Sequence, residues 1–103
     1  MKSLVVPALV LTLAAGAWAQ SSDLVARGEA AFRGNGCYGC HLVGTFGTPI
    51  GPDLSTVGRR YAPEYLARWL RDPALQRPNA HMPALELTEA DVAALAAYLS
   101  TLR

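Results

Sequence analysis

The sequence of 103 residues is poor in several residue types. It has two cysteines, two histidines and two methionines, and its single lysine is Lys2. Nine basic residues face eight acidic ones, so the formal net charge is only +1 and gives no indication of a nucleic-acid partner. No segment carries the alternating apolar pattern of a β-strand, and no internal repeat is present. We therefore expect neither a sheet fold nor a repeat architecture.

The first apolar run is too short to span a bilayer. Lys2 precedes an apolar stretch from Leu4 to Gly16, and Ala17-Trp18-Ala19 then leads into polar residues. A basic start, a short apolar core and an A-x-A site are typical of a secretory signal peptide. We predict a cleaved signal peptide at residues 1–19 and a domain at residues 20–103 that is periplasmic or otherwise exported, without stable insertion in the membrane. An uncleaved membrane anchor is the alternative.

Three segments of the predicted domain have the apolar periodicity of helices. Ser22 and Asp23 are candidate caps for the first helix, Pro63 suits the first turn of the second, and Thr88 with Asp91 forms a weak capping box for the third. Glycine and proline dominate the connections. The helices are expected at residues 24–33, 63–71 and 88–102, with loops at residues 34–60 and 73–87.

A domain of this size often needs a disulfide, a metal or a cofactor for stability. Its only cysteines lie in GNGCYGCHLVG, residues 34–44, which places Cys37, Cys40 and His41 within five positions. A disulfide between cysteines three apart closes a very short loop and adds little stability. A thioredoxin-like redox pair would need a preceding strand, and a zinc site would need four ligands.

The remaining interpretation of this motif is covalent haem attachment. C-x-x-C-H is the signature of c-type haem, in which two thioethers hold the porphyrin and the adjacent histidine ligates the iron. We therefore predict one haem c, covalently bound through Cys37 and Cys40, with His41 as an axial ligand of the iron. Such a group also fills the middle of a domain that is too small to build a sufficient core.

The second axial ligand must come from elsewhere in residues 20–103. Met82 is the only methionine there, and it lies in NAHMPAL, where Pro83 stiffens the chain. His81 is the rival ligand, and a core-filling role for Met82 is a further alternative. Adjacent residues of an extended segment point to opposite sides, so only one of the two side chains should reach the iron. We favour Met82 and assign His81 to the surface.

These motifs resemble those of the class I c-type cytochromes, in particular small bacterial monohaem cytochromes and the cytochrome domains fused to oxidases. RGEAAFRGNGCYGCH is similar to the first helix and haem motif of that family, and LTEADVAALAAYLSTL is similar to its last helix. The resemblance implies an all-α cytochrome c fold, with three main helices and loops wrapped around one covalently bound haem. It also implies ligation of the iron by His41 and Met82.

The resemblance extends to residues around the predicted cofactor. In GPDL, residues 51–54, it implies that the carbonyl of Pro52 accepts a hydrogen bond from the axial histidine. In VGRRY it places Arg59 and Arg60 near the haem propionates, together with Trp69, although a solvated basic turn explains the two arginines equally well. It also places Gly28, Phe32 and Tyr98 where the first and last helices cross.

The predicted ligands favour electron transfer over catalysis. A histidine and a thioether fill both axial positions, raise the reduction potential and leave no vacancy for a substrate. We expect a periplasmic single-electron carrier that is not itself an enzyme. Its expected partners are a donor dehydrogenase or quinol-oxidising complex and an acceptor oxidase or reductase. The alternative is a haem electron-transfer subunit of an enzyme complex, such as a sulfite- or thiosulfate-oxidising system; a gas or peroxide sensor would require a weak or absent Met82 ligand.

Two segments without charged side chains are expected to border the haem edge. Residues 34–52 and 78–85 contain no Asp, Glu, Lys or Arg. In the family fold these segments carry the thioethers and the distal ligand, respectively. We expect a mostly apolar docking rim formed by Tyr38, Leu42, Val43, Phe46, Ile50, Pro83 and Leu85.

Overall fold

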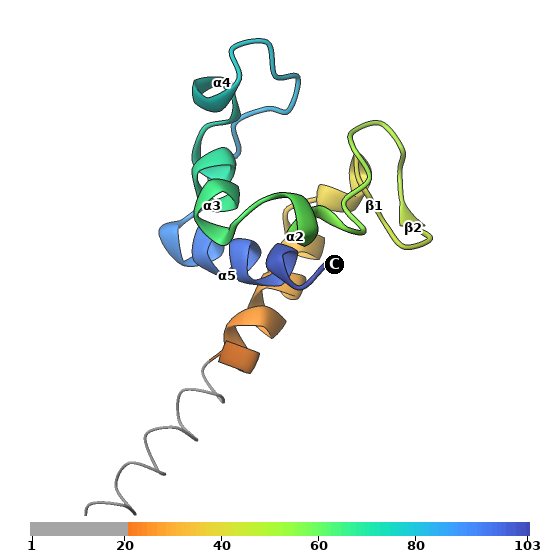
Figure 1. Cartoon of the computed structure of the whole chain (residues 1–103), viewed down its shortest axis with the longest axis vertical. Coiled ribbons are helices and arrows are strands. Elements are labelled where there is room, and N and C mark those ends of the chain that lie inside the picture. The colour runs from red at the N-terminus through yellow and green to blue at the C-terminus, as the bar shows by residue number, and fades with distance from the viewer. Residues whose placement is uncertain (1–20) are drawn as a thin grey trace, which may run out of the picture.

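The computed structural model describes residues 21–103, and the predicted signal peptide at residues 1–19 lies outside them. Helices make up most of the described chain, and the longest ones cross each other (Figure 1). The described part of the first helix, here called the N-terminal helix, covers residues 21–34. The later elements are η2 (Cys37–Gly39), β1 (Leu42–Val43), β2 (Phe46–Gly47), α2 (Val57–Arg60), α3 (Pro63–Arg71), α4 (Pro73–Gln76) and α5 (Glu89–Ser100).

The apolar stripes of α3 and α5 form the centre of the core. Leu66 and Leu70 of α3 are buried against α5, whose Leu95 is only 1 % exposed. Phe32 of the N-terminal helix joins the same cluster and is 2 % exposed. Burial of these side chains provides the hydrophobic driving force that holds the helices together. The expected all-α class is therefore confirmed in its main feature, a mostly helical fold.

A glycine allows the N-terminal helix to lie directly on α5. A Cβ atom at Gly28 would overlap the carbonyl oxygen of Ala94 and would lie 2.6 Å from the Cβ of Tyr98. The backbones of the two helices thus approach more closely than any side chain at this position permits. Phe32, one helical turn later, packs its ring against Tyr98 with centroids 5.7 Å apart. The crossing involves the residues that the family resemblance indicated.

The ends of α3 and α5 follow from local sequence signals. Pro63 occupies the first turn of α3, where its missing N–H costs nothing. Asp72 ends this helix and caps the next, because its carboxylate accepts a hydrogen bond from the backbone N–H of Leu75 at 3.3 Å. Thr88 caps α5 by accepting from the N–H of Asp91 at 3.1 Å, as its sequence pattern predicted.

The N-terminal cap prediction was wrong. Ser22 and Asp23 were expected to precede the first helix, but residues 21–23 are already helical. The carboxylate of Asp23 instead pairs with the guanidinium of Arg27 at 2.6 Å, one turn later on the same helix. An i,i+4 ion pair of this kind supports a helix from within.

The two segments expected to be loops contain a small hairpin and two short helices, α2 and α4. Strands β1 and β2 pair antiparallel, with Leu42 opposite Gly47 and Val43 opposite Phe46. The expectation that residues 34–60 form only loops and turns was therefore wrong at the hairpin. The turn requires glycine, since Gly44 has a φ of 62° and Gly47 a φ of 110°. A hairpin of two residues per strand is too short to produce a visible alternating pattern. The helices α2 and α4 have four residues each, which is too few to show a helical period.

The hairpin and the segment after α4 project from the helical body in different directions (Figure 1). The chain between α4 and α5 has no helix or strand and contains Met82. Within residues 21–103, none of the helices has the length and apolar character needed to cross a membrane.

Candidate functional site

The C-x-x-C-H motif folds as a compact turn at the end of the N-terminal helix. Gly36 enters the turn with a φ of 75°, and its carbonyl accepts from the N–H of Gly39 at 2.9 Å. The carbonyl of Cys37 then accepts from the N–H of His41 at 3.0 Å. This turn brings Cys37, Cys40 and His41 together through local bonds alone. No long-range contact is needed to group these three residues.

The two cysteines lie in different surroundings and form no disulfide with each other. Cys37 is half-buried and packs against the hydrophobic core, whereas Cys40 is exposed. Burial raises the pKa of the Cys37 thiol above its usual value, because the charged thiolate loses solvation. Among residues 21–103, no group of three or more His, Cys, Asp or Glu side chains lies close enough to hold a metal ion.

His41 is held by the segment that follows the hairpin. Its Nδ1 atom lies 2.7 Å from the carbonyl oxygen of Pro52, which fixes the ring and leaves Nε2 free for another partner. The N–H of Gly51 donates to the carbonyl of Cys40 at 2.5 Å, so the segment is tied to the motif. A Cβ at Gly51 would lie 2.7 Å from Cε1 of the imidazole. Only glycine lets the chain pass this close to the ring.

Met82 lies in the irregular segment between α4 and α5. It is half-buried and packs against the core, whereas the neighbouring His81 is exposed. Its Sδ atom accepts a hydrogen bond from Nε1–H of Trp69 at 3.1 Å. Met82 and Cys37, 45 positions apart in the sequence, thus pack against one hydrophobic core.

The two arginines of VGRRY lie on the surface. Arg59 and Arg60 are exposed on α2. Arg60 donates to the backbone carbonyl of Asp53 at 3.3 Å, and its guanidinium lies 6.0 Å from the centroid of the Tyr61 ring. These contacts tie α2 to the segment that contains Pro52. The propionate contacts of both arginines and of Trp69 stay predictions.

The residues present fit a covalently attached haem. Two thiols lie beside an imidazole whose Nδ1 is already engaged, and a thioether packs on the same core. The glycine at position 51 keeps the chain against His41 without a side chain that would push the ring away. The donor set of imidazole nitrogen and thioether sulfur is one that haem iron accepts. Cys37, Cys40, His41 and Met82 would hold the group.

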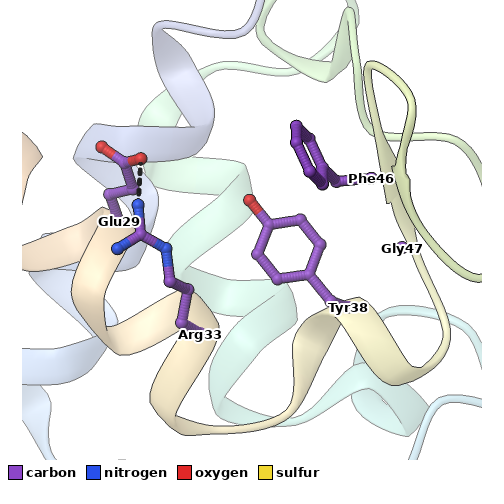
Figure 2. Close-up of a pocket in the computed structure, with 5 residues that line it drawn as sticks. All are labelled: Glu29, Arg33, Tyr38, Phe46 and Gly47. Carbon is purple, nitrogen blue, oxygen red and sulfur yellow. Dashed lines mark hydrogen bonds and ion pairs between the residues drawn. The ribbon is translucent and has the colours of Figure 1, made fainter.

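A pocket of about 430 Å³ lies on the outer side of the motif, between the N-terminal helix and the hairpin (Figure 2). The ion pair between Glu29 and Arg33 forms one wall, with a distance of 2.6 Å. Tyr38 and Phe46 face the same space from the other side (Figure 2). Tyr38 also packs edge-on against Phe32, with ring centroids 4.7 Å apart.

A second tyrosine, Tyr98 of α5, lies buried in the core. Burial, followed by a hydrogen bond with Tyr38, raises the pKa of Tyr98 to about 12. Both causes favour the neutral phenol, so Tyr98 stays protonated across the physiological pH range. The motif is connected to the helix crossing at Gly28 through Phe32, whose ring packs against both Tyr38 and Tyr98.

The fold and the site define a c-type haem protein, and comparison with known proteins agrees. Residues 25–103 match the model of the family described as cytochrome c, and the chain belongs to this family. Members of this family transfer electrons through haem. Cytochrome c oxidase subunit 2 of Alkalihalophilus pseudofirmus (strain ATCC BAA-2126 / JCM 17055 / OF4) is 36 % identical over 92 residues. The match covers 81 % of this chain but only 27 % of that protein.

Two features of the site were missed by reasoning from the sequence. The role of Gly51 had a signal, since a glycine directly before a proline suggests a close approach of backbone. The hydrogen bond from Trp69 to Met82 had no signal in the sequence, because the two residues are 13 positions apart and lie on different elements. The family resemblance placed Trp69 near the propionates and did not indicate this contact.

Proposed function

We propose that this protein is a periplasmic single-electron carrier with one haem c. Thioethers from Cys37 and Cys40 attach the haem, and His41 and Met82 ligate its iron. The observation that carries the proposal is the 2.7 Å contact between His41 Nδ1 and the Pro52 carbonyl, which orients the imidazole of a C-x-x-C-H motif for ligation. The half-buried position of Met82, next to the exposed His81, supports the choice of the distal ligand.

The protein's own residues set the chemistry of this site. A bound haem supplies an iron that gains and loses one electron. The carbonyl of Pro52 accepts the Nδ1 proton of His41, which fixes the tautomer and strengthens the donor character of Nε2. Met82 adds a soft thioether, which favours the reduced state. With both axial positions filled by side chains, the protein transfers electrons and is not itself an enzyme.

The export proposal has two supports. Membership in the cytochrome c family fits a location outside the cytoplasm. The predicted signal peptide at residues 1–19 gives a route to the periplasm.

An oxidase is the acceptor that the comparison favours. The relative of 36 % identity is named as a subunit of cytochrome c oxidase. We propose that this chain passes electrons to an enzyme of that kind and receives them from a dehydrogenase or quinol-oxidising complex. The same relative favours a second candidate function, in which the chain stays bound to an oxidase as its haem electron-transfer subunit.

A purification from the native host tests the function. We expect haem to remain on the chain after denaturation, and the oxidised protein to have the absorption band of sulfur-to-iron charge transfer. Cys37→Ser with Cys40→Ser should abolish the retained haem, because no thioether is left to form. A free carrier should elute as a monomer, whereas a subunit should copurify with oxidase. A wild-type chain that releases its haem on denaturation would refute covalent attachment.

The hairpin supports apolar docking to the redox partner. Phe46 is 73 % exposed and Ile50 is 75 % exposed, and the segment around them carries no charged side chain. Phe46 also lines the pocket beside Tyr38 (Figure 2). Among the other members of the expected rim, Leu42 and Val43 are half-buried, and Val43 packs against the core. The exposed members of the rim are Phe46 on the hairpin, Ile50 just after it, and Pro83 between α4 and α5.

Apolar docking predicts a weak dependence of electron transfer on salt. Charge steering is weakened by ionic strength, whereas apolar contact hardly responds to it. We expect the second-order rate constant for reduction of the oxidase to change by less than about threefold from low to moderate salt. Stopped-flow mixing measures this constant.

A matched pair of variants locates the docking surface. Phe46→Ser should lower the rate constant several-fold, and Leu75→Ser should leave it unchanged, because Leu75 is equally exposed (76 %) but lies on α4. A steep fall of the wild-type rate with salt would instead assign docking to the arginines of α2 and α3.

A further inference from the structure

The distal segment, residues 77–88 between α4 and α5, packs on the helical body through Met82 and Leu87. Trp69 lies on α3, between the buried residues Leu66 and Leu70 that pack this helix on α5. A bidentate pair between Arg71 and Glu89, with N–O distances of 3.1 Å, ties α3 to the start of α5. Trp69 therefore lies on a helix that packs in the core. Met82, by contrast, lies in a segment without helix or strand.

The contact between the two side chains has a defined chemistry. The indole Nε1–H is a donor only, and it lies 3.1 Å from Met82 Sδ, which is an acceptor only. A thioether sulfur has two lone pairs, so one is engaged by the indole and the other stays available. Because an indole has a single N–H, Trp69 cannot donate fully to a haem propionate while it makes this bond.

We propose that Trp69 is a positioning residue for the distal ligand, whose indole N–H orients Met82 Sδ and lowers its donor strength. The proposal rests on the proposed ligation of the iron by Met82. A hydrogen bond to the sulfur withdraws electron density from it, and a weaker donor stabilises the oxidised iron less. The bond therefore raises the reduction potential and loosens the sulfur–iron bond of the oxidised state.

Trp69→Phe tests this role in the holoprotein, because it keeps an aromatic ring and removes the N–H. The loss of one hydrogen bond changes an equilibrium constant, here that of one-electron reduction, by a factor of roughly five. We expect the reduction potential to fall by up to about 40 mV, which is the same factor converted for a one-electron couple. External imidazole should bind the oxidised variant about fivefold more weakly, because it must displace a sulfur that now donates more strongly.

A merely structural role predicts a different pattern. Loss of packing at Trp69 would loosen the distal segment, so imidazole would bind the oxidised variant more tightly. Leu70→Ala is the matched control, since this neighbour is 6 % exposed and packs in the core. It should lower the free energy of unfolding without moving the potential. An unchanged potential in Trp69→Phe, a rise in its imidazole affinity, or an equal shift in Leu70→Ala would each overturn the proposal.

A measurement on the wild-type protein needs no variant. Trp69 is the only tryptophan of residues 20–103, so the reduced protein, once its leader is removed, has one indole N–H resonance in its NMR spectrum. We expect a nuclear Overhauser effect between this proton and the Met82 methyl group, and its absence would overturn the contact. A wild-type spectrum without the charge-transfer band would be a separate failure, because it would refute ligation by Met82 before any test of Trp69.

Discussion

Replacing Met82 with alanine is expected to open the distal side of the iron to external ligands. The variant should bind carbon monoxide when reduced, and its oxidised form should lose the charge-transfer band, because both depend on the thioether. The reduction potential should fall by about 0.1 V or more, within the roughly 0.8 V that the choice of axial ligands spans. Optical spectroscopy and a redox titration measure these changes.

His81→Ala is the matched control for this prediction. His81 is adjacent to Met82 in the chain, but its side chain is exposed whereas that of Met82 is half-buried. The control should keep the wild-type spectrum and potential. If His81→Ala opens the iron and Met82→Ala does not, His81 is the distal ligand and the assignment made here is wrong.

Gly28→Ala is expected to cause a large loss of stability. The added Cβ would overlap the carbonyl oxygen of Ala94 and approach the Cβ of Tyr98 to 2.6 Å. These atoms belong to the backbone and to the root of a buried side chain, so the two helices must separate to relieve the overlap. We expect the free energy of unfolding to fall by about 3 kcal/mol, at the upper end of the cost of overpacking.

Gly34→Ala separates this steric effect from helix propensity. Gly34 belongs to the same helix, is exposed, and would have no atom within 4 Å of an added Cβ. Alanine is the better helix former, so this control should change the free energy of unfolding by less than about 1 kcal/mol. Denaturant titration of the two holoproteins measures both values. An equal effect of the two substitutions would show that close packing at Gly28 does not limit stability.

The sequence determined those parts of the protein that depend on neighbours along the chain. The C-x-x-C-H spacing predicted the site, because its turn is closed by bonds between residues at most four positions apart, such as His41 N–H to the Cys37 carbonyl. The stripes of α3 and α5 predicted those helices, since a period near 3.6 is visible in a single segment. Thr88 marked the start of α5 for the same reason.

Local signals were misleading where another partner was available. Asp23 resembled an N-cap, but its carboxylate bonds to Arg27 inside a helix that is already formed. The hairpin at residues 42–47 gave no alternating pattern, because two residues per strand are too few to show one.

Only the tertiary structure decided how distant segments meet at the site. Gly51 lies against the His41 ring, and the Pro52 carbonyl lies 2.7 Å from its Nδ1, because the hairpin returns the chain to the motif. Trp69 reaches Met82 because α3 packs on α5 and the distal segment passes beside α3 in the fold. The physical reason is that such contacts depend on the relative placement of whole elements, which is set by burial of the common core. The sequence thus indicated which groups would hold the haem, and the packing of the helices decided how those groups are oriented.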